Sequence, residues 1–162
     1  RATAQGVPVV VDPKYRNFFA YRGATVFKPN RRELESALGA AVDLDHPDAL
    51  PAMLDRLGVQ QLLLTLSEQG MALVQRTANS VQPTAAVAVE VHRIPTTARE
   101  VYDVVGAGDT VVAYLAAMLA AGATPLEAAV IANYAAGVEV GKLGAATVRT
   151  AEVLDAFDAH SA

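Results

Sequence analysis

The sequence predicts an α/β fold in which a mostly parallel sheet is flanked by helices. One reason is the uninterrupted, valine-rich run VPVVV at 7–11, which is typical of a strand buried on both faces of a parallel sheet. A second is that helix start and stop signals separate such runs, so that strands and helices alternate. A third is size: 162 residues, 52% of them hydrophobic, are enough to bury one core, and a single domain over 1–162 is expected.

The first half of the chain is expected to contribute three strands and two helices. The strands are expected at 7–11, 24–27 and 61–65. Asn30, followed three residues later by Glu33, has the spacing of a capping box and opens a helix that Gly39 closes. A second helix is expected over 48–57, before Gly58.

Two closely spaced strands are expected next. Residues 71–74 form one of them, and the SEQG stretch at 67–70 is a tight turn in which Gly70 can adopt a positive φ. Strands so close in sequence must be antiparallel. Residues 86–92 (AVAVEVH) continue the strand pattern.

The last third of the chain changes to helices. Residues 110–121 are apolar nearly all round, as expected of an interior helix. The TPLE stretch at 124–127 then supplies an N-cap, a proline at the first helical position and an acid at the third, for a helix that runs to about Gly141. A last short helix follows Thr150.

Composition excludes several classes of protein. With 13 Lys+Arg against 17 Asp+Glu the formal charge is -4, and no dense basic run is present, so nucleic acid is not expected as a partner. Charge, Gly or Pro interrupts every apolar stretch, so no membrane span is expected. There is no cysteine, which excludes disulfides and thiolate chemistry. The opening RATAQG resembles the last turn of a helix, which indicates a chain that begins part-way through a larger fold.

The most informative stretch is VYDVVGAGDT at 101–110, where an extended segment gives way to a helix. Glycines let the backbone approach a phosphate closely, and the unpaired amides and dipole of a first helical turn attract an anion. The plainer alternative is that Asp109 is an N-cap and the glycines form a tight turn. A carboxylate beside bound phosphate is unfavourable unless it serves the chemistry, for example as the base for an attacking hydroxyl.

DVVGAGDT resembles the D-T/V-x-GAGD-T signature of the ribokinase-like carbohydrate kinases, also called the phosphofructokinase B family. The resemblance implies a ribokinase-like fold and an anion hole for the transferring phosphoryl group at Gly106, Ala107 and Gly108. It implies that Asp109 is the catalytic base that activates a sugar hydroxyl. Asp103 matches a position that helps to hold a monovalent cation such as K⁺ in some members.

Other segments match the family in order. KPNRRE at 28–33 resembles the PN-x-x-E segment, which implies that Asn30 and Glu33 act near the phosphates and the Mg²⁺ water shell, although the same pair is also a plain capping box. TLSEQG resembles the element beside the nucleotide and contributes four candidate residues, namely Thr65, Ser67, Glu68 and Gly70. Asn133 matches a position near the adenine, or is a helix-interior polar residue satisfied locally.

Four stretches, VDPK, YRGAT, SEQGM and GKLGAATV, resemble the heptose 7-phosphate kinase branch of this family. The implied enzyme is cytoplasmic and transfers the γ-phosphoryl group of ATP, with Mg²⁺, to the anomeric hydroxyl of heptose 7-phosphate, giving the 1,7-bisphosphate. Lys14 could then contact a phosphate, although a lysine after a DP turn is more often just solvated.

The resemblance covers only the C-terminal half of such a kinase domain, without the sugar-binding half or the β lid. We therefore expect an apolar edge at 7–11 that is covered by self-association or by the other half. A non-catalytic nucleotide-binding or interaction module that keeps the anion hole is the alternative function. An NAD-binding domain is disfavoured, because GAGD is not GxGxxG and comes late in the chain.

Overall fold

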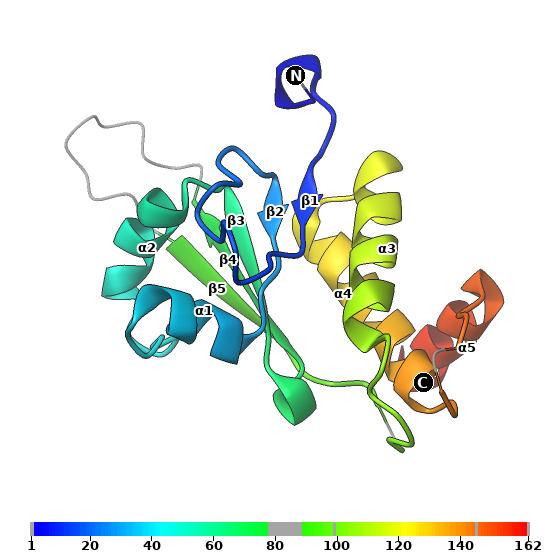
Figure 1. Ribbon diagram of the computed structural model, residues 1–162. Coiled ribbons are helices and arrows are strands. Elements are labelled where there is room, and N and C mark those ends of the chain that lie inside the picture. The colour runs from blue at the N-terminus through cyan, green and yellow to red at the C-terminus, as the bar shows by residue number, and fades with distance from the viewer. Residues whose placement is uncertain (1, 78–88, 99, 145, 162) are drawn as a thin grey trace. The chain divides into compact units, whose positions relative to one another are not determined.

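The computed structural model describes residues 2–77, 89–98, 100–144 and 146–161 (Figure 1). Its strands form one five-stranded sheet in the order β1-β2-β3-β4-β5. The chain divides into two compact units. Unit 1 comprises Arg1–Ser67 and Met71–Arg93, and unit 2 comprises Glu68–Gly70 and Ile94–Ala162.

The sheet has the expected parallel part and the expected antiparallel pair. β1 (Val10–Val11), β2 (Val26–Phe27) and β3 (Gln61–Thr65) are parallel to one another. A 3-10 turn at Ser67–Gln69 leads into β4 (Met71–Arg76), which pairs antiparallel with β3. β5 (Val89–Ile94) is next to β4 in the strand order. The α/β prediction is confirmed, as a mixed sheet.

Two strands differ from their predictions. β1 is not a five-residue strand buried on both faces: it has two residues, both half-buried, at the edge of the sheet. An edge strand has a neighbour on one side only, and Pro8 has no N–H to donate. β4 extends two residues beyond the predicted 71–74. Of the strand predicted at 86–92, residues 86–88 lie outside the described residues.

Helices α1 (Arg31–Leu38) and α2 (Leu50–Leu57) cover one face of the sheet in unit 1 (Figure 1). A 3-10 turn at Pro47–Ala49 precedes α2, which accounts for the early start predicted for that helix. The shared core contains side chains from both helices and from alternate positions of β3 and β4, including Leu34, Leu54, Leu57, Leu62, Leu64, Ala72 and Val74. Leu62 and Leu64 anchor β3 in this core, and Thr65 is the last residue of β3.

Unit 2 contains α3 (Ala107–Ala120), α4 (Pro125–Val140) and α5 (Thr150–Ser161). α3 packs against α4, and α4 packs against α5. The cap predicted for α4 is present: the Thr124 side chain accepts from the Glu127 N–H, and the Glu127 carboxylate accepts from the Thr124 N–H at 2.8 Å. In the described part of the chain, no helix is long and apolar enough to cross a membrane.

α3 is not the all-round interior helix that the sequence predicts. It starts three residues before the expected Thr110, and its buried side chains are Val111, Leu115 and Leu119. These three residues are spaced by four and form one stripe. Much of the remaining surface is alanine, and a helix rich in alanine looks apolar in sequence although each methyl group gains little from burial.

Glu152 in the first turn of α5 is expected to make the stability of unit 2 acid-sensitive. Its carboxylate pairs with Lys142 at 2.8 Å and accepts from the Arg149 N–H at 2.8 Å. The hydrogen bond from Lys142, followed by those from Arg149, lowers the pKa of Glu152 from 4.5 to about 2. Because the folded pKa is below the unfolded pKa, this contribution is complete above pH 4.5 and is lost as the pH falls towards 2.

The thermal unfolding midpoint should therefore fall less steeply in Glu152→Gln than in the wild type between these two pH values. Circular dichroism melts across the range measure it. Asp158→Asn on the same helix is the control, since Asp158 has no ion pair among the described residues. Equal slopes in wild type and Glu152→Gln would refute the assignment.

Candidate active site

The GAGD segment forms the N-cap and first turn of α3. Gly106 is the N-cap, with φ 99°, a left-handed conformation that glycine adopts without strain. The Thr110 N–H donates to the Gly106 carbonyl at 2.9 Å and closes the first turn. Ala107, Gly108 and Asp109 are then the first three helical residues, so the alternative in which Asp109 is the N-cap is wrong.

Two amides of this turn are available to an anion. Among the described residues, the N–H groups of Gly108 and Asp109 have no protein acceptor, whereas the Ala107 N–H makes a long contact of 3.4 Å with the Val104 carbonyl. The Asp109 side chain is exposed and has no hydrogen bond or ion pair within the same part of the chain. The positive end of the helix dipole lies at this turn. The arrangement can therefore combine anion binding with a free carboxylate.

Asp103 holds the segment that leads into α3. Its Oδ1 accepts from the Val105 N–H at 2.9 Å, two residues along the chain. The N–H groups of Tyr102 and Asp103 both donate to the Val140 carbonyl, at 2.8 and 3.3 Å. These bonds attach the approach to the GAGD turn to the C-terminal end of α4.

Glu139, in the last turn of α4, is a buried acid that sequence reasoning missed. It is 1% exposed, and neither carboxylate oxygen has a well-formed hydrogen bond within the described residues. Burial raises the pKa of Glu139 and the charge of Asp103 adds to the rise, while the nearby Ala146 N–H and Lys142 counteract it. The available signal was a glutamate in the otherwise apolar run ANYAAGVEV.

Asn30 and Glu33 form a reciprocal cap at the start of α1. The Asn30 Oδ1 accepts from the Glu33 N–H, and the Glu33 Oε2 accepts from the Asn30 N–H, both at 2.8 Å. The capping interpretation is therefore confirmed. It leaves the Glu33 Oε1 without a partner among the described residues, so that a further role for this carboxylate is geometrically open.

The carboxyl ends of β2 and β3 bring Asn30 and Thr65 together. The Thr65 N–H donates to the Pro29 carbonyl at 3.2 Å, and Asn30 and Thr65 form a parallel bridge. Ser67 follows with φ 53°, unusual for a residue with a side chain. Of the other candidates, Glu68, Gly70, Asp103, Asn133 and residues 106–109 belong to unit 2.

A charged cluster at the carboxyl ends of β1 and β2 was also missed, apart from Lys14, for which the sequence suggests a phosphate contact. Lys28 is 4% exposed, and its Nζ lies 2.9 Å from the Asp12 Oδ1, while the Lys14 Nζ lies 2.7 Å from the Asp12 Oδ2. Burial alone would raise the pKa of Asp12, but hydrogen bonds from both lysines outweigh it and lower the pKa. Lysine is almost never buried without such a partner. Lys28 of this pair lies two residues before Asn30 in the chain.

Asn133 is not satisfied locally within α4. Its side-chain Nδ2 donates to the Pro95 carbonyl at 2.8 Å, and its backbone carbonyl accepts from the Thr97 hydroxyl at 3.3 Å. Thr97 also lines a cavity of about 520 Å³, together with residues of α4 and α5 that include Tyr134, Gly137, Val138, Asp155 and His160. Asn133 therefore fixes one wall of a cavity in unit 2.

No group of three or more His, Cys, Asp or Glu side chains among the described residues could hold a metal ion. Mg²⁺ in phosphoryl-transfer sites usually binds one or two carboxylates together with substrate phosphates and keeps several waters. The unpaired oxygen of Glu33 fits that mode of binding. A cage made of protein ligands alone is not present in this part of the chain.

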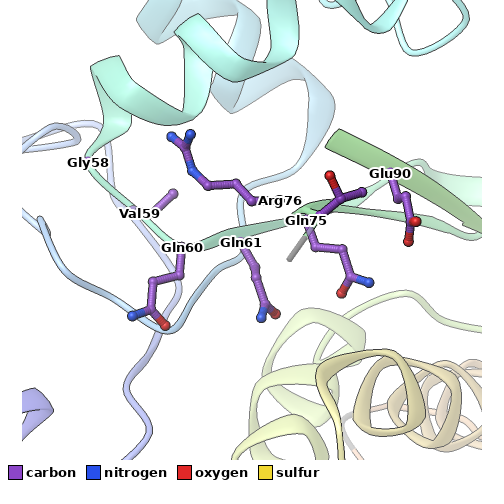
Figure 2. A pocket seen from close by; sticks show the side chains of 8 residues that line it. Gly58, Val59, Gln60, Gln61, Gln75, Arg76 and Glu90 are labelled. Carbon is purple, nitrogen blue, oxygen red and sulfur yellow. The ribbon is translucent and has the colours of Figure 1, made fainter. Parts of the chain in front are cut away.

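Another cavity, of about 560 Å³, lies in unit 1 at the end of β3 that is opposite to Asn30 and Thr65 (Figure 2). Gln60, Gln61 and Gln75 point to the same side of the sheet there, and the Gln75 Nε2 lies 3.0 Å from the His92 Nε2. No predicted site residue lines it. Gln61 begins β3 and Thr65 ends it, so this cavity is separate from the Asn30–Thr65 end.

Comparisons with known proteins agree with these observations. The model of the pfkB family carbohydrate kinases matches residues 1–151. "Bifunctional protein HldE" of Pelobacter propionicus is 48% identical over 158 residues, which are 96% of this chain and 30% of that protein. This chain thus spans about a third of the length of the curated relatives it matches.

Two solved structures show the same fold. Ribokinase from Giardia lamblia has a TM-score of 0.76 at 24% identity, over 98% of this chain and 52% of that one. Arabidopsis thaliana ribokinase, solved with ribose and ATP, has a TM-score of 0.70 at 25% identity, over 94% of this chain and 48% of that one. The ribokinase-like fold expected from the GAGD signature is confirmed, and the chain belongs to the pfkB family of carbohydrate kinases.

Proposed function

We propose that the chain carries the nucleotide and catalytic part of an ATP-dependent sugar kinase. The observation that supports it most strongly is the first turn of α3, which offers the Gly108 and Asp109 amides, without protein acceptors in the described chain, beside an exposed Asp109 carboxylate. Family membership supports a carbohydrate as the acceptor. The VDPK, YRGAT, SEQGM and GKLGAATV stretches favour heptose 7-phosphate, with the 1,7-bisphosphate as product.

In the proposed reaction, Asp109 takes the proton of the sugar hydroxyl as its oxygen attacks the γ-phosphorus of ATP. A new P–O bond forms to the sugar, and the bond between the γ-phosphorus and ADP breaks. The Gly106–Asp109 turn stabilises the charge on the migrating group through its amides and the helix dipole. Mg²⁺, when bound with ATP, neutralises phosphate charge. Most of the catalysis in such a site is positioning and electrostatic stabilisation.

The other candidate residues receive supporting roles in this proposal. Asn30 and the free oxygen of Glu33 would face the phosphates and the waters of Mg²⁺, next to Thr65 at the end of β3. Ser67, Glu68 and Gly70 would lie beside the nucleotide. Asn133 would lie near the adenine, and Asp103 would bind a monovalent cation such as K⁺. We place the enzyme in the cytoplasm, where ATP is available.

We further propose that the chain acts as the C-terminal part of a kinase domain whose other half supplies the sugar-binding residues and the lid. β1 is the edge strand of the sheet, and the exposed fraction of Val7, just before it, is 51%. Exposed edges with apolar residues favour pairing with another chain. The isolated chain should therefore self-associate or bind the other half.

Size-exclusion chromatography with light scattering tests this expectation. Dimers or larger species should form at micromolar concentration, and added N-terminal half should convert them to a defined complex. A chain that stays monomeric and does not bind the N-terminal half would show that the β1 edge is not an interface.

The alternative function is a non-catalytic nucleotide-binding or interaction module, favoured by the fact that the chain matches about half of the solved kinases' length. Calorimetric titration with MgATP, followed by a coupled ADP-release assay with heptose 7-phosphate and the other half of the domain, separates the two. ATP binding with sugar-dependent ADP release is expected. ATP binding without ADP release would favour the nucleotide-binding module, and no ATP binding would reject both the kinase and the nucleotide-binding module.

A further inference from the structure

Glu139 is a charged group that the proposed phosphoryl transfer does not use. It lies in the last turn of α4, it is 1% exposed, and both of its carboxylate oxygens are buried without a hydrogen bond of acceptable geometry among the described residues. Buried polar groups in native proteins are almost always satisfied, and a buried charge is normally paired or bound to a metal ion. The side chain therefore needs an explanation.

Among the described residues, no counter-charge near Glu139 is free to satisfy it, and the nearby Ala146 N–H makes no hydrogen bond of acceptable geometry with the carboxylate. Asp103 is close enough for its negative charge to act on Glu139. The Asp103 N–H donates a hydrogen bond to the carbonyl of Val140, the residue that follows Glu139. Lys142 is nearby, but its Nζ is already 2.8 Å from both the Glu152 Oε1 and the Thr147 carbonyl. Two acids thus lie together at a helix C-terminus, where the dipole also favours a cation.

We propose that the Glu139 carboxylate is a second anionic ligand of a monovalent alkali cation bound between Glu139 and Asp103. The proposal deepens the proposed function, because it rests on the cation that we assign to Asp103 there. The family resemblance points to Asp103 alone, whereas the orphaned oxygens of Glu139 come from the packing of this chain. A cation bound here would compensate the negative charge of both acids. Their carboxylate oxygens are hard ligands of the kind that alkali ions bind.

A monovalent ion suits the local charge. The negative charge of Asp103 acts on Glu139, and Lys142, which is paired with Glu152, counteracts only part of it. One further positive charge balances what remains. Mg²⁺ instead demands an octahedral shell and keeps most of its waters, which a side chain with 1% exposure cannot accommodate.

The cation would position the catalytic turn without touching substrate. Asp103 holds the Val105 N–H through its Oδ1, one residue before the Gly106 N-cap. An ion shared by Glu139 and Asp103 therefore ties the end of α4 to the start of α3. Glu139 is accordingly a positioning residue, and its effect should be measurable with neither nucleotide nor sugar present.

The test is thermal unfolding of the chain in KCl and in choline chloride at equal ionic strength, for wild type and Glu139→Gln. KCl should raise the wild-type Tm by about 5 °C at saturation. Glu139→Gln should lose at least two thirds of that rise and should be no less stable than wild type in choline, because it removes an uncompensated buried charge. Glu127→Gln, at the exposed start of the same helix, should keep the full rise.

Several results would overturn the proposal. They are an equal KCl effect in wild type and Glu139→Gln, no KCl effect in the wild type, or an effect produced by MgCl₂ and not by KCl. If Glu139→Gln fails to fold, Asp103→Asn serves as the second variant and must also lose the KCl effect. Since no nucleotide or sugar is added, failure here leaves the kinase proposal standing, and an inactive kinase leaves the cation result unaffected.

Discussion

Replacing Asp109 by Asn is expected to lower kcat by at least about 100-fold, because loss of a general base typically costs 10²–10⁴ in rate. The amide keeps the shape of the side chain but cannot accept the proton of the sugar hydroxyl. Asp109 is exposed and has no bonded partner among the described residues, so the change should not disturb packing. An acid in the first helical turn contributes only about 0.3–1 kcal/mol through the helix dipole.

The measurement pairs turnover with nucleotide affinity in a polypeptide that carries a complete kinase domain. The Kd for MgATP should remain within about twofold of wild type, since the amides that bind the phosphates are unchanged. Asp48→Asn, an exposed acid of unit 1, is the matched control and should keep full turnover. Turnover of Asp109→Asn close to that of wild type would show that another group is the base.

Gly70→Ala is expected to be the most destabilising single substitution that we consider. Gly70 has φ 83°, and a methyl group there would lie 2.2 Å from the Ile94 carbonyl oxygen and 2.5 Å from the Thr96 nitrogen. Both are backbone atoms, so relief requires the chain itself to move. The left-handed conformation costs about 1–2 kcal/mol, and forced overpacking adds roughly 1–3 kcal/mol.

Gly122→Ala separates these two contributions. Gly122 has a similar φ of 92°, but a methyl group there meets nothing within 4 Å. It should lose only the conformational part, about 1–2 kcal/mol. Urea unfolding of both variants measures the difference, and equal losses would mean that the backbone at Ile94–Thr96 yields without cost. Because Gly70 belongs to the TLSEQG segment, Gly70→Ala should also weaken ATP binding.

Local signals predicted most of the helices correctly. Asn30 with Glu33, and Thr124 with Glu127, are capping boxes in the structure as in the sequence, because each is made by residues three positions apart. Gly39 and Gly58 end their helices in the left-handed conformation for the same local reason.

The sequence was less informative where burial depends on distant neighbours. The run at 7–11 was predicted as a strand buried on both faces, but β1 has only two residues, both half-buried, at the edge that the sequence also led us to expect. α3 looked buried all round but buries one stripe. The predicted start of α3, at Thr110, was too late in the chain. Gly106 is the N-cap and has no side chain, so the usual polar capping signal is missing from the sequence.

The sequence predicted the motif residues of the candidate site, but it did not predict the buried charged residues near them. Residues 106–109 and Asn30 stand in recognisable sequence patterns. The Asp12–Lys28 pair joins two strands 16 positions apart, and Glu139 is isolated by its tertiary environment. Neither has a local pattern, because each is defined by a partner or by the lack of one in the folded chain.

The central claim is that the amides at the start of α3 bind the migrating phosphoryl group while Asp109 takes the proton of the attacking hydroxyl. A crystal structure of the complete domain with ADP, a planar metal-fluoride mimic of that group and the sugar phosphate tests it most directly. We predict fluorine atoms about 3 Å from the Gly108 and Asp109 nitrogens, and an Asp109 oxygen about 3 Å from the sugar hydroxyl. A mimic bound away from these amides, or an Asp109 side chain turned away from the hydroxyl, would contradict it.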